Sequence, residues 1–368
     1  MVSWLSILQD PRALCEVPDG PLLVRIDSYG QDHAVEKAML ARGWPDAREA
    51  GAATLSPAAI EALREERGRI LAPRQQHLGV ERVLADLEPI FADRPRWTVL
   101  SPPSSVRELF DKRITSRRYA ALGIPVPRAL GDIATPDELR ERVRAASLRQ
   151  VYVKLSCGSS ASCLGIYQDD AQGGSFVTTV ELARPVAGSR DRLLYNSRKL
   201  RRYVGAAADE VLRFLLREGA QVEERVAKAR LGGEHFDLRV LVIAGEPAFT
   251  VVRQSPREIT NLHLGGRRGD PAELGRHAPP EVLEAALASA RRVFDAHGCF
   301  HVGVDVMIEH GWCGHRVLEA NAFGDFFPGL TRDGLSVYAW EIRAAEAMLS
   351  TGSLRAGTRS STPSPKTA

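Results

Sequence analysis

Two short segments toward the C-terminal end of the chain, residues 303–308 and 317–322, are mainly apolar and carry polar side chains only at Asp305, Glu319 and Asn321. Both segments are rich in apolar and β-branched residues, and the polar, glycine-containing stretch between them predicts a β-hairpin. If the hairpin is centred on Trp312, Asp305 lies directly opposite Glu319. Two carboxylates then face each other on one wall, which is costly for buried like charges unless a cation neutralises them.

A third oxygen ligand follows from the alternation of side chains between the two faces of a strand. Asn321 is two residues after Glu319, so the two side chains share a face of the strand. Carboxylate and amide oxygens are the ligands that hold magnesium, usually together with substrate phosphates. The hairpin therefore predicts a metal site made by Asp305, Glu319 and Asn321. An ordinary hairpin with solvated acids on its outer face is the alternative.

The rest of the hydrophobic pattern predicts a mixture of strands and helices. A small α/β unit is expected at the N-terminus, with strands at 21–27 and 97–100 and a helix over 57–93. From Gln150 onward strands dominate, beginning with 150–155. Further elements are expected as a hairpin of 237–243 with 248–253, an amphipathic helix over 280–297 and a last helix over about 336–349.

Composition limits the class of protein. A chain of 368 residues is long enough for two or three compact units, and its net charge of +3 gives no argument for nucleic acid or membrane as a partner. It has no apolar run of about 18 residues and no signal-peptide pattern at the N-terminus. Five cysteines without framework spacing suit a reducing cytoplasm. The polar tail 351–368 is expected to be disordered.

Two further regions carry candidate anion-binding groups. Lys154 enters a Gly/Ser-rich loop, residues 156–165, whose backbone amides can close over phosphates. The loop lacks the Gly-Lys-Ser/Thr of a P-loop, so a ligand-free hairpin tip and a surface lysine are the alternatives. In the hairpin about Gly245, symmetry predicts that Arg239 lies opposite Arg253, an arrangement that favours an anion between them.

Three other features have weaker interpretations. His263 is more often a structural hydrogen-bonding residue than a catalyst. Cys299, His301, Cys313 and His315 can be interpreted as a four-ligand zinc set, although their spacing matches no common zinc module. The basic run 196–203 is typical of a solvated helix or loop face, with a docking site for an acidic partner as the alternative.

In chain order, these motifs resemble the ATP-grasp superfamily, specifically its branch of glutathione synthetases and ribosomal-protein glutamate ligases. The resemblance covers about residues 109–335, and it rests on the order of motifs that are individually short. The matching positions are Asp111-Lys112, Lys154, the loop 156–165, the run 222–226, Asp237, Arg253, the run 260–266 (Thr-Asn-Leu-His-Leu-Gly-Gly), Asp305, Glu319 and Asn321.

The resemblance implies roles for these residues. The run 222–226 would be the hinge whose backbone reads adenine, with Glu224 in the acidic position, and Asp237 would approach the ribose. The implied nucleotide-binding residues are Lys112, Lys154, Ser159, Ser160, Glu223, Glu224, Arg225, Val226, Asp237, Thr260 and Asn261. The implied catalytic residues are Arg253, Arg239 and Asn261, and the implied metal ligands are Asp305, Glu319 and Asn321.

The chain departs from the family pattern at three places. Ile259 stands where these ligases commonly carry an arginine, which affects a phosphate or acceptor contact. The segment 321–329 is longer than the family's Asn-x-x-Pro-Gly, so a different substrate is expected. Residues 185–218 are expected to form an insertion before the hinge.

The expected fold class is therefore α/β (α+β), an ATP-grasp fold in which two α+β subdomains clamp the nucleotide between them. The expected boundaries are an N-terminal α/β domain at 1–108, a first subdomain at 109–225, a second at 226–350 and a disordered tail at 351–368.

The implied activity is that of a cytoplasmic ATP-dependent carboxylate–amine (or thiol) ligase that works through an acylphosphate. Its cofactors would be ATP and Mg²⁺ (or Mn²⁺). Its partners would be a small-molecule or peptide carboxylate and an amine or thiol acceptor, with no nucleic acid and no membrane, and a homodimer remains open. The alternatives are a phosphotransferase on the same fold and a nucleotide-binding regulatory protein without turnover.

Overall fold

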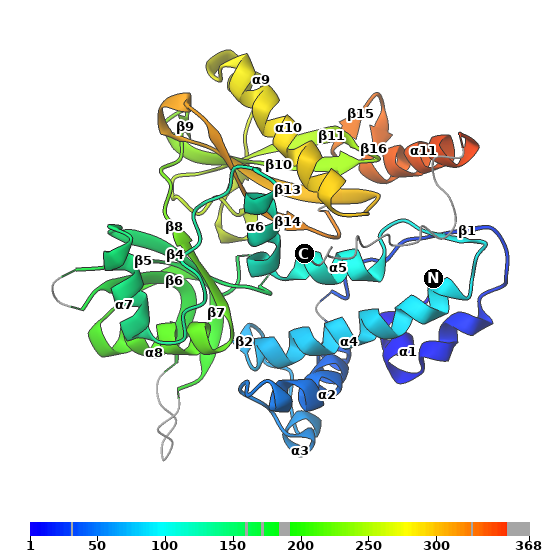
Figure 1. Ribbon diagram of the computed structural model, residues 1–368, viewed down its shortest axis with the longest axis horizontal. Helices are drawn as coiled ribbons and strands as arrows, with labels where there is room; N and C mark the ends of the chain where they lie inside the picture. Colours follow the sequence, from blue (N-terminus) through cyan, green and yellow to red (C-terminus); the bar gives the residue numbers. More distant parts are fainter. Residues whose placement is uncertain (31, 159–160, 171–172, 184–191, 325–326, 352–368) are drawn as a thin grey trace, which may run out of the picture.

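The computed structural model describes residues 1–30, 32–158, 161–170, 173–183, 192–324 and 327–351. Three lobes meet near the centre of the molecule, where α5 of the first lobe and the following helix α6 lie (Figure 1). The first lobe is mainly helical, and each of the others is built on a six-stranded sheet. The predicted mixed α/β fold class is confirmed. In the described part of the chain, no helix is both long and apolar enough to cross a membrane.

The N-terminal lobe is held together by the crossing of helices α2 and α4. Gly43 and Gly79 permit the contact, because a Cβ at Gly43 would lie 1.9 Å from the Gln75 carbonyl oxygen and one at Gly79 1.9 Å from that of Met39. The lobe contains α1 Trp4–Gln9, η1 Pro11–Glu16, β1 Leu22–Val24, α2 His33–Glu49, α3 Pro57–Glu61, β2 Arg69–Ile70, α4 Pro73–Ala92, β3 Trp97–Val99 and α5 Pro103–Phe110. Strands β1 and β3 pair in parallel.

The helix predicted over 57–93 is wrong as a single element. The chain forms α3 and α4 with the short strand β2 between them. Gly68 has φ +80°, a conformation that leaves the helix, and Pro73 starts α4 at the first helical position. Strand β2 then joins the sheet of the second lobe by pairing with β7.

The second lobe is an antiparallel sheet in the order β2-β7-β6-β5-β4-β8, with α7 and α8 packed against one face. Strand β4 shows the reason: Val151, Val153 and Leu155 are buried under the helices, whereas Tyr152 and Lys154 face the other way. The elements are α7 Pro136–Ala145, β4 Gln150–Leu155, β5 Leu164–Gln168, β6 Ser175–Leu182, β7 Leu194–Val204, α8 Gly205–Arg217 and β8 Ala220–Glu224. The preceding helix α6, Lys112–Ala121, packs instead against α5 and the third lobe.

The basic run 196–203 lies in strand β7, not in the helix or loop that its composition suggested. The run forms a strand because it pairs with β6, which supplies its backbone hydrogen bonds. Its own sequence has no pattern that favours a strand.

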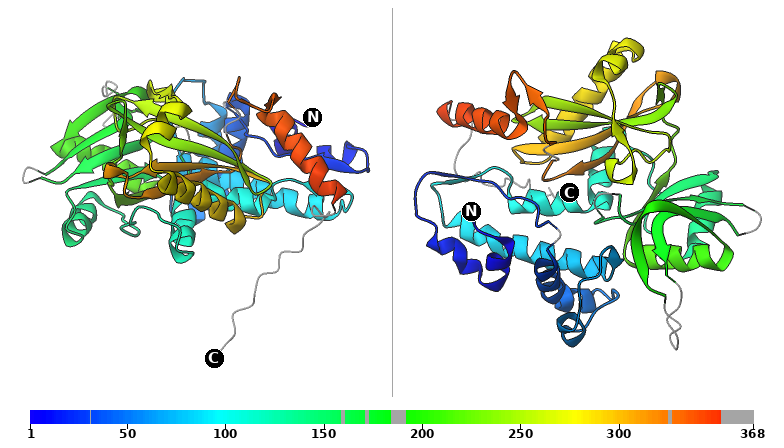
Figure 2. Two further views of the ribbon diagram at one scale, coloured as in Figure 1. Left: turned by 90° about the horizontal axis from the view of Figure 1, so that it is seen from above. Right: turned by 180° about the vertical axis from the view of Figure 1, so that it is seen from behind.

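The third lobe contains an antiparallel sheet in the order β12-β11-β10-β13-β14, with β9 paired to β10 and α10 covering one face (Figures 1 and 2). The predicted helices over 280–297 and 336–349 are confirmed as α10 and α11. The elements are β9 Arg230–Leu231, β10 Glu234–Ile243, β11 Glu246–Ser255, η2 Leu262–Leu264, β12 Arg267–Arg268, α9 Pro271–His277, α10 Pro280–Ala296, β13 His301–Ile308, η3 His310–Trp312, β14 His315–Asn321, β15 Thr331–Arg332, β16 Leu335–Ser336 and α11 Val337–Ser350.

The register of β13 with β14 matches the prediction. Asp305 lies opposite Glu319, and Asn321 lies opposite Gly303. A bulge after Asp305 shifts the register only on the turn side of this pair. The facing carboxylates are therefore a property of the hairpin itself.

The predicted pairing of Arg239 with Arg253 is wrong, because Arg253 lies opposite Asp237. The turn of this hairpin is centred on Ala244 and Gly245, both at positive φ, and a bulge follows within β10. Turn and bulge together move the register by two residues from the symmetric expectation. The anion that faces Arg253 is thus a carboxylate of the protein.

A buried histidine between the lobes should make stability depend on pH. The His297 side chain is fully buried, with Nε2 2.8 Å from the Tyr119 hydroxyl and Nδ1 3.2 Å from the Glu108 carboxylate. Burial lowers its pKa from 6.5 to about 4, so the unfolded chain binds more protons between these values. The free energy of unfolding should fall by about 3 kcal/mol as the pH is lowered through this range.

Urea unfolding from about pH 7 to about pH 4 tests this expectation. His297→Gln should flatten the dependence, whereas His310→Gln, at an exposed position, should leave it unchanged. Equal slopes in the wild type and the His297 variant would contradict the assignment.

Candidate functional site

A chamber with about 810 Å³ of empty space, part of it open solvent, lies between the sheets of the second and third lobes. Strands β4 and β8 supply one wall, strands β10, β11, β13 and β14 supply the other, and the start of α6 reaches its edge. Its lining combines apolar residues, among them Tyr152, Met307 and Leu318, with neutral polar and charged ones. The predicted residues that line it are Lys112, Lys154, Glu223, Glu224, Val226, Asp237, Arg253, Thr260, Asn261, Asp305 and Glu319.

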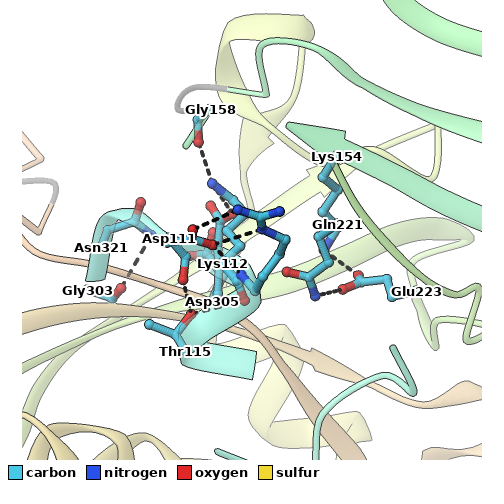
Figure 3. Close-up of polar contacts among 12 residues, drawn as sticks. Asp111, Lys112, Thr115, Lys154, Gly158, Gln221, Glu223, Gly303, Asp305 and Asn321 are labelled. Carbon is cyan, nitrogen blue, oxygen red and sulfur yellow. Dashed lines mark hydrogen bonds and ion pairs between the residues drawn. The ribbon is translucent and has the colours of Figure 1, made fainter. Parts of the chain in front are cut away.

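Lys112 is held at the first position of α6. Asp111 caps this helix by accepting a hydrogen bond of 2.8 Å from the Arg113 backbone N–H. The Lys112 ammonium donates to the carbonyl oxygen of Gly158 and lies 3.5 Å from the Glu319 carboxylate (Figure 3). The lysine therefore connects the loop after β4 with the wall made by β14.

Lys154 and Glu223 form an ion pair on the chamber side of the second sheet. The Glu223 carboxylate also accepts a 2.8 Å hydrogen bond from the Gln221 amide (Figure 3). Burial raises the pKa of Glu223 even though Lys154 opposes the shift. The carboxylate of Glu224 instead accepts a 2.9 Å hydrogen bond from the Arg128 backbone N–H, so the acidic group that reaches Lys154 is Glu223.

Asp237 is the centre of a buried hydrogen-bond network. Its carboxylate accepts from Arg253 Nε at 2.7 Å, from Lys228 Nζ at 3.1 Å and from the Thr260 hydroxyl. Burial alone raises the pKa of Asp237, but Arg253 and Lys228 hold it well below its usual range. The residue is therefore ionised and both of its oxygens have partners.

Asp305 is held by two arginines. Arg239 binds both of its carboxylate oxygens, with Nη2 at 3.1 Å from Oδ2, and Arg253 Nη2 lies 3.0 Å from the same oxygen. Gly303 makes room for this pair, because a Cβ there would lie 3.2 Å from Arg239 Nη1 and 3.1 Å from the Cα of Gly324. Arg253 thus bridges Asp237 and Asp305.

Glu319 and Asn321 complete the wall on β14. Burial raises the pKa of Glu319, but Lys112, Lys154 and the nearby arginines lower it to about 2, so the side chain is an anion at neutral pH. The Asn321 amide nitrogen lies 3.4 Å from the Gly303 carbonyl oxygen, which positions the side chain beside the chamber (Figure 3). Asn321 itself is not among the residues that line the chamber.

These residues fit a nucleotide triphosphate with a divalent cation. One chamber is lined by the four cations Lys112, Lys154, Lys228 and Arg253 and by the four carboxylates Glu223, Asp237, Asp305 and Glu319. A fifth cation, Arg239, binds Asp305 from behind this lining. Cations suit phosphate oxygens, and the oxygen donors of Asp305, Glu319 and Asn321 suit magnesium. The apolar lining at Tyr152 and Met307 suits a flat base.

Other predicted residues lie elsewhere. Arg225 forms an ion pair of 2.8 Å with Glu258 and does not line the chamber, and Arg239 reaches the site through Asp305. Ser159 and Ser160 lie outside the described residues. The zinc interpretation is wrong for the described residues, which hold no group of three or more His, Cys, Asp or Glu suited to a metal.

Lys228 is the functional candidate that the sequence analysis missed. Its side chain is buried, it lines the chamber, and it binds Asp237 at 3.1 Å. The available signal was alternation, since Lys228 is two residues after Val226 and shares its side of an extended segment. In the sequence, a lysine just before a strand is otherwise indistinguishable from a solvated one.

Comparison with known proteins gives structural likenesses only. No protein-family model matches the chain, and no curated protein matches it. Among solved structures, a RiPP-associated ATP-grasp ligase of Chryseobacterium gregarium, in complex with ADP and a leader and core peptide, is 13% identical, with 92% of this chain and 99% of that chain covered and a TM-score of 0.46. D-cycloserine synthetase is 16% identical, with 90% of this chain and 99% of that chain covered and a TM-score of 0.47.

A D-alanine–D-alanine ligase from Bacillus anthracis is 14% identical, with 89% of this chain and 92% of that chain covered and a TM-score of 0.42. These likenesses are too distant to assign an activity. The function is therefore proposed from the residues of the site.

Proposed function

We propose that the chain is an ATP-dependent carboxylate–amine (or thiol) ligase of the ATP-grasp type. The observation that carries the proposal is the facing pair Asp305 and Glu319 on β13 and β14, in a chamber that also receives Lys112, Lys154 and Arg253. Oxygen ligands for a cation and basic groups for phosphates meet in one place, as phosphoryl transfer requires.

Each part of the chamber has a role in this proposal. Lys112 and Lys154 bind phosphate oxygens, and the segment from Glu223 to Val226 borders the base beside Tyr152. Asp305, Glu319 and Asn321 hold Mg²⁺ (or Mn²⁺), which neutralises phosphate charge when bound. Further groups near the phosphates are Arg239, Arg253, Asp237, Thr260 and Asn261.

The reaction takes place in two steps. A carboxylate oxygen of the acid substrate bonds to the γ-phosphorus as the bond to the ADP oxygen breaks, which gives an acylphosphate. The acceptor's nitrogen or sulfur then bonds to the acyl carbon and loses its proton, while the carbon–oxygen bond breaks and inorganic phosphate leaves. Arg253 stabilises charge on the transferring phosphoryl group, and the position of the chamber between two sheets limits the access of water.

Product analysis separates this activity from its alternatives. With Mg²⁺-ATP and a panel of carboxylic acids and peptides, we expect ADP and inorganic phosphate in equal amounts only when an acceptor is also present. Hydroxylamine should trap the activated acid as a hydroxamate, detected by mass spectrometry. Glu319→Ala serves as the inactive control.

Two results would contradict the ligase proposal. A phosphorylated product that accumulates without an acceptor, and without inorganic phosphate, indicates a phosphotransferase. Tight ATP binding with no turnover across the panel indicates a regulatory nucleotide-binding protein.

A further inference from the structure

Strand β7 has an open edge on the sheet of the second lobe. It is eleven residues long, but β2 pairs only with Leu194 and Tyr195. The Asn196 backbone N–H donates a hydrogen bond to the Gly68 carbonyl oxygen. Among the described residues, no strand pairs with the outer edge from Ser197 to Val204. Only the last four residues of this edge, 201–204, are in regular register with β6. Residues 197–200 form an irregularity opposite residue 179, where the Lys199 backbone N–H donates to the Ser197 hydroxyl, so the regular open edge is the stretch 201–204. An edge of this kind presents unpaired backbone groups to an incoming strand.

The same edge carries an excess of positive charge. Arg198, Lys199 and Arg202 are exposed, and none of them forms an ion pair with another described residue. Arg201 pairs with Glu181 at 2.7 Å. This edge therefore carries four basic side chains, and only one of them is paired with a carboxylate of the described residues. The edge is strongly basic, although the net charge of the whole chain is only +3.

The edge is continuous with the chamber side of the sheet. Cross-strand pairs run from Arg202 through Val177 and Ile166 to Tyr152, and Tyr152 lines the chamber. Directly opposite residues share a face, so Arg202 lies on the chamber side. Val204, on the same face as Arg202, is 62% exposed. The turn η2, which follows the chamber residue Asn261, lies against β7.

We propose that the open edge of β7 binds an acidic, extended segment of a polypeptide substrate as an added strand. This inference rests on the proposed ligase function and names the substrate class: the acid or the acceptor is part of a peptide. Backbone pairing holds the segment, and Arg198 and Arg202 select its acidic side chains. Val204 offers an apolar contact beside them.

A nucleic acid fits this edge less well. Base stacking needs exposed aromatic rings, and the aromatic residue of the regular stretch, Tyr203, is packed against the core on the helix-covered side. A second alternative is that the charges only protect the edge from aggregation. Protection of that kind needs no exposed apolar residue beside the charges, whereas the exposed Val204 lies on the same face as Arg202.

Fluorescence anisotropy with the full-length protein tests the proposal. The probe is a labelled hexapeptide of alternating glutamate and valine, and the comparison probes are the lysine–valine peptide, the acidic peptide with alternate amides N-methylated, and a uridine oligonucleotide. Arg198→Glu with Arg202→Glu should weaken binding of the acidic peptide about tenfold. Arg96→Glu with Arg213→Glu, the same charge change at exposed positions outside β7, should not weaken it.

N-methylation should abolish binding, because it removes the backbone donors that an added strand uses. The proposal would be overturned if the basic peptide or the N-methylated peptide bound as tightly as the acidic peptide. It would also be overturned if the oligonucleotide bound more tightly than the acidic peptide, or if the acidic peptide did not bind. A fluorescent ATP analogue is titrated in parallel and should bind the wild type and both double variants equally. Failure of that titration for the wild type argues against the ligase function and leaves the peptide result to be judged separately.

Discussion

Replacing Glu319 with alanine should lower ATP-dependent turnover at least about 100-fold and leave the fold intact. Glu319 is the carboxylate that faces Asp305, and its pKa of about 2 keeps it charged at neutral pH. Loss of this oxygen ligand removes half of the carboxylate pair that would hold the divalent cation. Steady-state ADP release measures the loss, and thermal unfolding checks the fold.

A second readout keeps this prediction separate from catalysis. Mn²⁺ binding in the presence of a non-hydrolysable ATP analogue, followed by electron paramagnetic resonance, should weaken in Glu319→Ala and also in Glu319→Gln. Glu284→Ala removes an exposed carboxylate from α10 and should change neither measurement. Wild-type turnover in the Glu319→Ala variant would exclude the metal assignment.

Arg253 should affect both stability and turnover, and two substitutions separate these effects. In Arg253→Ala the buried carboxylates Asp237 and Asp305 lose a shared cation, so the free energy of unfolding should fall by about 3–5 kcal/mol. Arg253→Lys keeps one positive charge but cannot bind both carboxylates through a planar fork. We expect it to remain folded and to lose about 100-fold in turnover.

Urea unfolding and single-turnover hydroxamate formation measure the two effects. Arg213→Ala and Arg213→Lys, at an exposed position on α8, are the matched controls. Normal turnover in Arg253→Lys would show that the arginine only neutralises buried acids and takes no part in phosphoryl transfer.

The arginine network shows where sequence reasoning reached its limit. The sequence analysis placed Arg239 opposite Arg253 with an anion between them, but the anion that faces Arg253 is the carboxylate of Asp237. A turn at Ala244-Gly245 and a bulge in β10 set the register, so Asp237 is the facing residue. Register is a property of the paired strands, and a shift of two residues preserves the alternation that the sequence displays.

The basic run and the helix predicted over 57–93 failed for a related reason. A polar, charged segment such as 196–203 has no periodicity that distinguishes an edge strand from a solvated loop, and pairing with β6 decides its structure. In the other segment, Gly68 and Pro73 were visible, but strand β2 exists only because it pairs with β7 from another lobe.

The sequence by itself determined the elements whose signal is local. Two mainly apolar segments on either side of a polar turn determined the β13–β14 hairpin and the facing pair of Asp305 and Glu319, and amphipathic periodicity determined α10. Only the tertiary structure decided that the buried Lys228 reaches Asp237 and that two arginines hold Asp305. Local periodicity records which face of an element is apolar, but the charge partner across a chamber is set by how separate sheets pack, which no short segment encodes.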